Sequence, residues 1–242
     1  MRLDVYLAEK GLTKSRAAAA ALIKARGVSV NGKIIEKSAF EVSESDDVKI
    51  VGETLKYVGR GGLKLEKALE IGKIDLRGKT CLDIGASTGG FTDCMLQNGA
   101  ERVVAVDVGT NQLDEKLRGD KRVISLENTD IREYFPEEQA DFIGTDVSFI
   151  SLKLILPHIF RLLKTGGKAA VLVKPQFEAG NSSFGRKALS KKGVVTDEKT
   201  RLGIVAEVKN FAEQCGFAVT CTASSPIKGG SGNVEYLMIL EK

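Results

Sequence analysis

The chain has 242 residues, of which 43% are hydrophobic and 28% charged, so it is long enough to bury one large core or two smaller ones. No apolar run approaches the roughly 18 to 20 residues of a membrane span, which disfavours a transmembrane protein. Asp4 and Glu9 interrupt the N-terminal segment before an apolar signal region forms, so we expect a cytoplasmic protein.

The four cysteines do not have the spacing of a metal cluster. No CxxC pair is present, and the chain has one histidine, so a Cys/His zinc site cannot be completed. Thiols in a reducing compartment have no reason to pair. We therefore expect four buried free thiols, no disulfide and no bound metal.

Residues 1–52 are predicted to form a small α+β module. A short helix stops at Gly11, and an alanine-rich helix opens near Ser15 and ends at Gly27. Asn31-Gly32 then forms a type I′ turn between two short strands, because both residues tolerate positive φ. Further short strands are expected around Val42, Val48 and Ile50.

Positive charge gathers in this module. Between positions 10 and 37 the chain carries seven lysines and arginines against one glutamate, and an acidic segment follows at 41–47. A basic stretch of this kind, set apart from the acidic residues in sequence, suggests a polyanionic partner. A solvated helix face is the alternative explanation for the cations of the alanine-rich helix.

The same module resembles the RNA-binding domain named after the small-subunit ribosomal protein S4. The resemblance rests on Arg2-Leu3-Asp4-Val5-Tyr6-Leu7, on Ser15-Arg16 and on Val28-Ser-Val-Asn-Gly-Lys33. It implies that structured RNA is bound by a cationic helix face and the adjacent hairpin, mainly through phosphates. The candidate RNA-binding residues are Lys14, Arg16, Lys24, Arg26, Asn31 and Lys33.

From residue 79 to 242, short apolar runs alternate with helical stretches, which predicts a doubly wound, mostly parallel α/β sheet of Rossmann-like type. Residues 53–78 are expected to link the modules and supply the first helix of this domain. A helix is expected at 196–215, followed by a closing antiparallel strand pair. The expected parallel strands are 80–84, 102–107, 123–126, 141–146 and 168–174.

The turn after the first of these strands is rich in glycine. Glycines there let the backbone approach a nucleotide and leave helix amides free to bind it. Asp107, at the end of the second strand, is placed to accept hydrogen bonds from ribose hydroxyls. Because Ser87 replaces the second glycine of GxGxxG, adenosine with an amino-acid tail fits better than a dinucleotide. The candidate cofactor-binding residues are Asp83, Gly85, Ser87, Gly89, Gly90 and Asp107.

Gly85-Ala-Ser87-Thr-Gly89 also satisfies the GxSxG pattern of hydrolases, and Asp146 and His158 follow in hydrolase order. However, His158 belongs to a segment whose apolar spacing predicts a packed helix, away from the strand ends where a catalytic base is needed. A hydrolase is therefore disfavoured.

The larger domain resembles the S-adenosylmethionine-dependent 2′-O-ribose methyltransferases of the FtsJ type. With the N-terminal module, the order of parts is similar to the TlyA/hemolysin A family of ribosomal RNA methyltransferases. The matching segments are 57–65, 83–92, 145–149, 173–178 and 232–236. The resemblance implies S-adenosylmethionine as cofactor, a ribose 2′-hydroxyl of ribosomal RNA, with cytidine suggested, as the acceptor, and ribosomal RNA or ribosomal subunits as partner, without membrane action.

The resemblance also implies a catalytic Lys-Asp-Lys-Glu set at Lys64, Asp146, Lys174 and Glu235. A ribose hydroxyl is a poor nucleophile, and a cation beside its oxygen favours the alkoxide. Two surface ion pairs are the alternative for these four residues. Asp130 is implied to contact adenine, with an ordinary helix N-cap as its alternative.

Residues 179–195 combine small residues with four cations, among them Arg186 and Lys187. A mobile loop that grips RNA is one interpretation, and a solvated connection is the other. Two rival functions stay open for the whole chain: a non-catalytic RNA-binding protein that keeps the fold, and a cytolysin. Measured cofactor binding would distinguish an enzyme from the non-catalytic protein, and a liposome leakage assay would test for a cytolysin.

Overall fold

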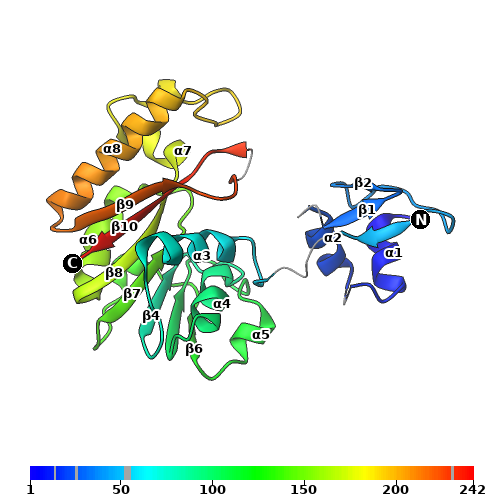
Figure 1. Cartoon of the computed structure of the whole chain (residues 1–242), viewed down its shortest axis with the longest axis horizontal. Coiled ribbons are helices and arrows are strands. Elements are labelled where there is room, and N and C mark those ends of the chain that lie inside the picture. The colour runs from blue at the N-terminus through cyan, green and yellow to red at the C-terminus, as the bar shows by residue number, and fades with distance from the viewer. Residues whose placement is uncertain (14, 25–26, 52–55, 230–231) are drawn as a thin grey trace. The chain divides into compact units, whose positions relative to one another are not determined.

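The computed structural model describes residues 1–13, 15–24, 27–51, 56–229 and 232–242, so the predicted RNA-binding residues Lys14 and Arg26 lie outside the described residues. Its contacts divide the chain into two compact units, Met1–Lys56 and Tyr57–Lys242. In Figure 1 the first unit is blue and the second runs from cyan to red.

The first unit packs two helices against a small antiparallel sheet of strand order β2-β1-β3. Its elements are α1 (Leu3–Glu9), α2 (Arg16–Lys24), β1 (Val28–Val30), β2 (Lys33–Ile34) and β3 (Val48–Ile50). Leu3, Leu7, Ile23 and Val28 are fully buried between the helices and the sheet. The predicted type I′ turn forms, with φ of +50° at Asn31 and +77° at Gly32.

The predicted strand around Val42 is wrong. Val42 is buried in the core, but among the described residues its backbone bonds to Met1 alone: the Met1 amine donates to the Val42 carbonyl and the Val42 amide donates to the Met1 carbonyl, each at 2.8 Å. A single isolated bridge joins Arg2 to Glu41. Because α1 begins at Leu3, no extended partner remains with which Val42 can continue a ladder.

The second unit contains a seven-stranded sheet of order β6-β5-β4-β7-β8-β10-β9. The five strands β4 to β8 run parallel to one another, whereas β10 is antiparallel to both β8 and β9. The strands are β4 (Thr80–Ile84), β5 (Arg102–Val106), β6 (Val123–Leu126), β7 (Ala140–Thr145), β8 (Leu163–Val173), β9 (Ala218–Ser224) and β10 (Tyr236–Glu241).

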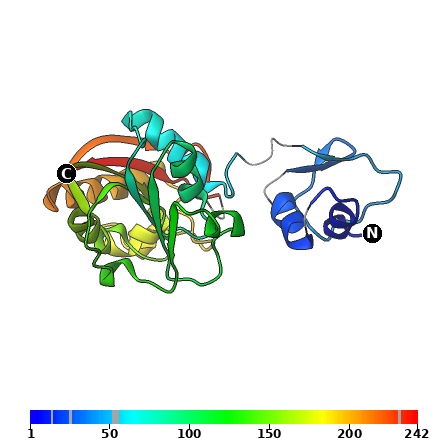
Figure 2. The same cartoon turned by 90° about the horizontal axis from the view of Figure 1, so that it is seen from below.

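The sheet lies between two helical layers, as Figures 1 and 2 show. Helices α3 and α4 cover one face, and α6 and α8 cover the other. The helices are α3 (Gly61–Gly72), α4 (Gly90–Gln97), α5 (Glu115–Arg118), α6 (Leu156–Leu162), α7 (Pro175–Glu178) and α8 (Glu198–Gln214). The 3-10 turns are η1 (Ile131–Glu133), η2 (Leu152–Leu154), η3 (Ala179–Asn181) and η4 (Arg186–Ala188).

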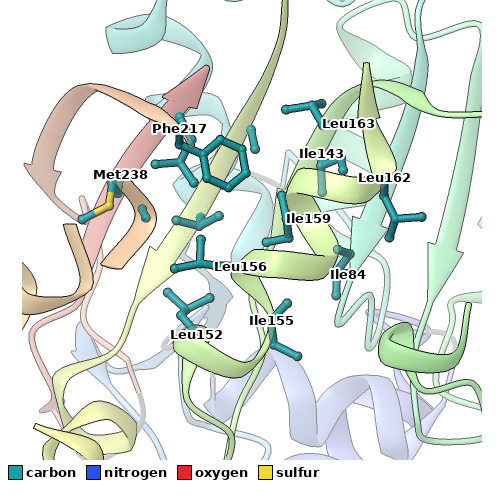
Figure 3. Packing of buried hydrophobic residues seen from close by; sticks show 14 of the residues in the cluster. Ile84, Ile143, Leu152, Ile155, Leu156, Ile159, Leu162, Leu163, Phe217 and Met238 are labelled. Carbon is teal, nitrogen blue, oxygen red and sulfur yellow. The ribbon is translucent and has the colours of Figure 1, made fainter. Parts of the chain in front are cut away.

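Side chains alternate between the two layers along each central strand. Phe142 packs toward α3 and α4, whereas its neighbour Ile143 packs toward α6, where Figure 3 shows it beside Ile159 and Leu162. Because both faces are covered, most residues of the central strands β4, β5 and β7 are buried, as expected for a parallel sheet. No helix among the described residues combines the length and apolarity of a membrane span.

The chain first adds β5 and β6 on one side of β4 and then returns to add β7 and β8 on the other side. The carboxyl ends of β4 and β7 therefore flank a topological switch point, where open α/β sheets bind ligands. Among the cysteines, Cys81 and Cys94 are buried, but Cys215 and Cys221 are half-buried, so the expectation of four buried thiols is wrong.

Candidate active site

Three adjoining cavities lie at the carboxyl ends of β4, β5, β7 and β8, and Asp146 and Ser148 line all three. The tetrad cavity, of 520 Å³, is lined by Lys64, Asp146, Lys174 and Glu235 among others. The strand-end cavity, of 490 Å³, contains Asp107 and Asp130 in its wall. The loop cavity, of 210 Å³, is lined by residues 59–61 and by the turn after β4.

The fold brings the four predicted catalytic residues together from four elements. Lys64 lies in the first turns of α3, Asp146 follows β7, and Lys174 follows β8. Tyr236 of β10 pairs antiparallel with Val173 of β8, so Glu235, just before β10, is placed beside the end of β8. Residues far apart in sequence thus meet in one cavity.

Lys64 joins the two acids of this group. Its Nζ donates to Glu235 Oε2 at 2.7 Å and to Asp146 Oδ2 at 3.2 Å. Lys174 Nζ lies 2.6 Å from Asp146 Oδ1, an ion pair without hydrogen-bond geometry, and donates to Ser148 Oγ at 2.8 Å. Two cations thereby balance two anions.

These contacts are not surface ion pairs. Lys64, Lys174 and Glu235 are each more than nine-tenths buried, and Asp146 is largely buried. The alternative of two surface ion pairs is therefore wrong. Burial removes solvent screening, so each charge depends strongly on its partners. The catalytic role of the four residues stays a prediction.

The turn after β4 depends on glycine at two positions. Gly85 has a φ of +81°, and a Cβ there would lie 2.9 Å from the Asp146 carbonyl oxygen. Gly89 has a φ of +94°, and a Cβ there would lie 2.3 Å from a Leu117 methyl group. Glycine thus permits both the left-handed backbone and the close approach of β4 to the segment after β7.

Asp107 and Asp130 both reach the strand-end cavity. Asp107 already accepts backbone hydrogen bonds from Ser87 at 2.8 Å and Gly109 at 2.7 Å, which hold the glycine turn against the end of β5. Asp130 caps η1 through the Arg132 amide at 2.9 Å and pairs with the Arg132 guanidinium. The N-cap interpretation of Asp130 is confirmed, and its carboxylate also stands in the cavity wall.

Of the other predicted cofactor-binding residues, some line the cavities and some do not. Gly85, Ser87 and Gly90 line the cavities, whereas Gly89 shapes the turn from outside their walls. Asp83 is fully buried, accepts a 2.6 Å hydrogen bond from Thr92, and lines none of the three cavities. The expected direct contact of Asp83 with a cofactor is therefore not supported, because its side chain faces α4 rather than the strand-end opening.

The hydrolase interpretation fails on geometry. Ser87 Oγ bonds to Gln112 at 3.2 Å, and His158 lies on α6 outside all three cavities. Burial, followed by the Arg161 cation, lowers the pKa of His158 below its usual value.

Among the predicted RNA-binding residues, Arg16, Lys24 and Lys33 are exposed on the first unit. Arg16 also donates to Asp4 at 3.2 Å. Asn31 has a structural role, since its side chain binds Asp46 and the Asp47 amide. Arg186 and Lys187 are exposed on η4 of the second unit.

The segment 179–195 is not a simple solvated connection, because it packs onto α8, and its role in gripping RNA stays a prediction. The Ser183 amide donates to Glu207 of α8 at 3.0 Å, and Ala179 and Val195 pack with Ile204. A Cβ on Gly203 would lie 2.3 Å from the Phe184 ring, so this glycine makes room for the ring. The segment carries Lys192 into the wall of the tetrad cavity.

Sequence reasoning missed two side chains that line these cavities. Ser148 fixes the Lys174 ammonium, and Phe149 is 91% exposed with a φ of +64°. The Phe149 ring lies 5.0 Å from that of Phe177. Their position directly after β7, within Thr145-Asp-Val-Ser-Phe149, is the signal from which both were recoverable.

Comparison with known proteins agrees with this geometry. Residues 57–242 match the FtsJ-like methyltransferase family, and residues 1–48 match the S4 domain. A Mycobacterium tuberculosis relative named 16S/23S rRNA (cytidine-2′-O)-methyltransferase TlyA is 41% identical over 99% of this chain and 89% of its own length. Hemolysin A of Brachyspira hyodysenteriae is 44% identical over 98% of both chains. The chain belongs to the TlyA/hemolysin A family of rRNA 2′-O-methyltransferases.

Solved structures support the same assignment. A hemolysin candidate from Streptococcus thermophilus is 45% identical and superposes with a TM-score of 0.78, covering 100% of this chain and 88% of that one. An S-adenosylmethionine-dependent methyltransferase from Mesorhizobium loti, 13% identical with a TM-score of 0.55, covers 76% of this chain and 100% of that one, and shares the fold. The predicted fold class, a doubly wound α/β domain with a small α+β domain, is thus confirmed.

Asp83, which lies outside the three cavities, gives the free energy of unfolding a testable dependence on pH. Burial raises the pKa of Asp83 to about 7, so between the ordinary pKa and that value the folded chain holds a proton that the unfolded chain releases. Stability should therefore fall as pH rises from 4 to 7, by about 1.4 kcal/mol per pH unit from this group. Urea unfolding at several pH values should show that slope reduced in Asp83→Asn. If the free energy of unfolding depends on pH in the same way in the natural chain and in Asp83→Asn, the raised pKa of Asp83 is contradicted.

Proposed function

We propose that this chain transfers a methyl group from S-adenosylmethionine to the ribose 2′-hydroxyl of a cytidine in ribosomal RNA, and that it acts in the cytoplasm. The observation that carries the proposal is the buried cluster of Lys64, Asp146, Lys174 and Glu235 in a cavity that adjoins the strand-end cavity. Relatives from Mycobacterium tuberculosis and Campylobacter jejuni, 41% and 37% identical, are named for cytidine-2′-O methylation of ribosomal RNA.

The strand-end cavity fits an adenosine. Its wall combines the Asp107 and Asp130 carboxylates with apolar side chains, among them Val108, which is 70% exposed. Carboxylates accept hydrogen bonds from ribose hydroxyls and amino groups, and apolar side chains cover the faces of a purine. The loop cavity continues from Gly85 and Ser87 toward Asp146 and Lys174, which gives an amino-acid tail a route toward the tetrad.

When bound, S-adenosylmethionine supplies an electrophilic methyl group on its sulfonium sulfur. The tetrad has to present the 2′-oxygen to that methyl group, so that the oxygen–methyl bond would form as the sulfur–methyl bond breaks and the hydroxyl proton is released to water. The Lys174 ammonium, fixed by Asp146 and Ser148, stabilises negative charge on the oxygen. Lys64, held between Asp146 and Glu235, keeps the Asp146 carboxylate in place.

RNA binding is supported by charge on both units. Arg16, Lys24 and Lys33 are exposed on the S4 domain. At the tetrad cavity, the exposed cations Arg60, Lys192 and Lys228 have no ionic partner among the residues that the structure describes. Unpaired cations around a cavity favour a phosphate-bearing substrate.

Replacing Asp107 by alanine should weaken S-adenosylmethionine binding by about 1 to 3 kcal/mol, because a pair of charge-assisted hydrogen bonds is lost. Isothermal calorimetry measures this directly, with NAD as a ligand that should not compete. Asp75→Ala removes an exposed acid outside the cavities and is the control. Unchanged affinity in Asp107→Ala would contradict the cofactor site.

Reversing Arg16 and Lys24 to glutamate should weaken RNA binding and flatten its salt dependence, because two cations that face phosphates become anions. Cofactor affinity should stay nearly constant. The matched control reverses Lys199 and Lys209, two exposed lysines of α8, with the same change in net charge. Equal loss of RNA affinity in both variants would show a general charge effect rather than binding by the S4 domain.

Replacing Lys174 by alanine should reduce methyl transfer at least about 100-fold, the scale of losing one positioned electrostatic or proton-transfer group. RNA and cofactor affinity should change far less, and Lys174→Arg should not restore the rate because the bulkier, planar guanidinium does not fit the place of the ammonium between Asp146 and Ser148. A tritiated-methyl assay on ribosomal subunits, with mapping of the product, measures the rate and the modified nucleotide.

Lys168→Ala is the control for that variant, since Lys168 lies on β8, the strand that Lys174 follows, and has a more exposed side chain. Near-normal turnover in Lys174→Ala would refute the role of Lys174. Absence of transfer by the natural chain to every subunit would favour a non-catalytic RNA-binding protein.

A further inference from the structure

A fourth cavity, of 390 Å³, lies beside the tetrad cavity and has no part in the reaction described above. Phe149, Gln176 and Phe177 line both cavities, so the two spaces are neighbours across this shared wall. Its remaining wall includes Leu154 of η2 and Leu189. We name it the flanking cavity. Its volume lies within the range of about 300 to 1,000 Å³ that is usual for small-molecule sites.

The apolar part of this wall is unusually open. Phe149 is 91% exposed and Leu154 is 53% exposed. Phe149 also has a φ of +64°, a backbone conformation that costs free energy in a residue with a bulky side chain. An exposed aromatic ring held by strained backbone next to a reaction site indicates a surface that a ligand covers.

Polar groups of one kind accompany the apolar wall. Gln176 Oε1 is buried and has no hydrogen-bond partner among the described residues, and the Asn181 amide lines the same cavity. Arg186 is exposed beside them and has no ionic partner in the described chain. Amides carry both donors and acceptors, which match the edges of nucleobases, and a guanidinium binds phosphate or stacks on a base.

We propose that the flanking cavity binds the unstacked base of a nucleotide adjacent to the methylated one. The inference rests on the proposed function, because an RNA strand with one ribose at Lys174 has its adjacent nucleotides next to the tetrad cavity. Proteins that read RNA in sequence stack splayed bases on aromatic rings and bind their edges with polar side chains. Phe149, Phe177, Gln176 and Asn181 supply both kinds of contact, and Arg186 supplies charge for the connecting phosphate.

The experiment compares two exposed leucines. Leu154→Glu puts a charge into the apolar wall, whereas Leu202→Glu changes a leucine of similar exposure, 50%, on α8 outside the cavity. Leu154→Glu should raise KM for an rRNA fragment that contains the methylated nucleotide by about tenfold or more, the scale of losing one stacked base. The kcat, the calorimetric affinity for S-adenosylmethionine and the melting temperature should match those of Leu202→Glu.

Fragments with an abasic ribose on the 5′ or the 3′ side of the methylated nucleotide then identify the occupant. With the natural chain, one of the two positions should raise KM as much as Leu154→Glu does, and combining that fragment with Leu154→Glu should add nothing. Fluorescence anisotropy of the same RNAs gives the same comparison without turnover.

The proposal is overturned if Leu154→Glu behaves like Leu202→Glu. It is also overturned if Leu154→Glu weakens binding while neither abasic fragment does, since the cavity would then contact another partner, such as a ribosomal protein. If the natural chain transfers no methyl group, the proposed function fails, whereas the anisotropy comparison still decides whether a base occupies the cavity.

Discussion

The carboxylate of Asp146 is the interaction on which the site depends. It faces a buried lysine on each oxygen, Lys64 at 3.2 Å and Lys174 at 2.6 Å, and its backbone carbonyl lies where only a glycine at position 85 fits. The end of β7 is thus fixed by charge and by backbone packing. The strand-end, loop and tetrad cavities all border Asp146, so the positions proposed for the cofactor and for the acceptor ribose are set together.

Burying four charges is costly, and a buried ion pair contributes little net stability compared with apolar residues of similar volume. The tetrad nevertheless holds its charges in balance, since Lys64 and Lys174 offset Asp146 and Glu235. Removing either lysine leaves an uncompensated anion in a poorly solvated place. A cluster of this kind in an otherwise apolar sheet is therefore better explained by chemistry than by folding, which agrees with its place at the switch point.

Much of this arrangement follows from sequence, because a sheet buried on both faces produces short apolar runs that end in polar residues. Asp107 is predicted in that way, whereas Asp146 and Lys174 are implied by the resemblance to the methyltransferase family, and their strand-end positions agree with it. What the pattern does not contain is the direction in which a side chain leaves the strand end. Asp83 also follows apolar residues, yet it faces α4 and binds Thr92. Val42 is of a residue type typical of strands, but the segment opposite it turns into helix α1 at Leu3 and cannot continue a ladder. The packing of residues 179–195 onto α8 depends on Phe184 fitting over Gly203, a contact between distant residues with no local signal.

Two groups of cations surround the tetrad cavity, one buried and one exposed, and their electric fields differ in range. Inside the cavity the lysines are neutralised by Asp146 and Glu235, so their field is short-ranged and acts on an atom in contact with them. At the edge, Arg60, Lys192 and Lys228 are exposed without an ionic partner among the described residues, so their field extends toward solvent over about a Debye length, roughly 8 to 10 Å. The outer cations are suited to attracting the phosphates of an RNA chain, and the inner ones to contacting a single ribose oxygen. Salt should therefore act on binding more than on the chemical step, because added ions screen the outer cations and cannot enter the buried pairs.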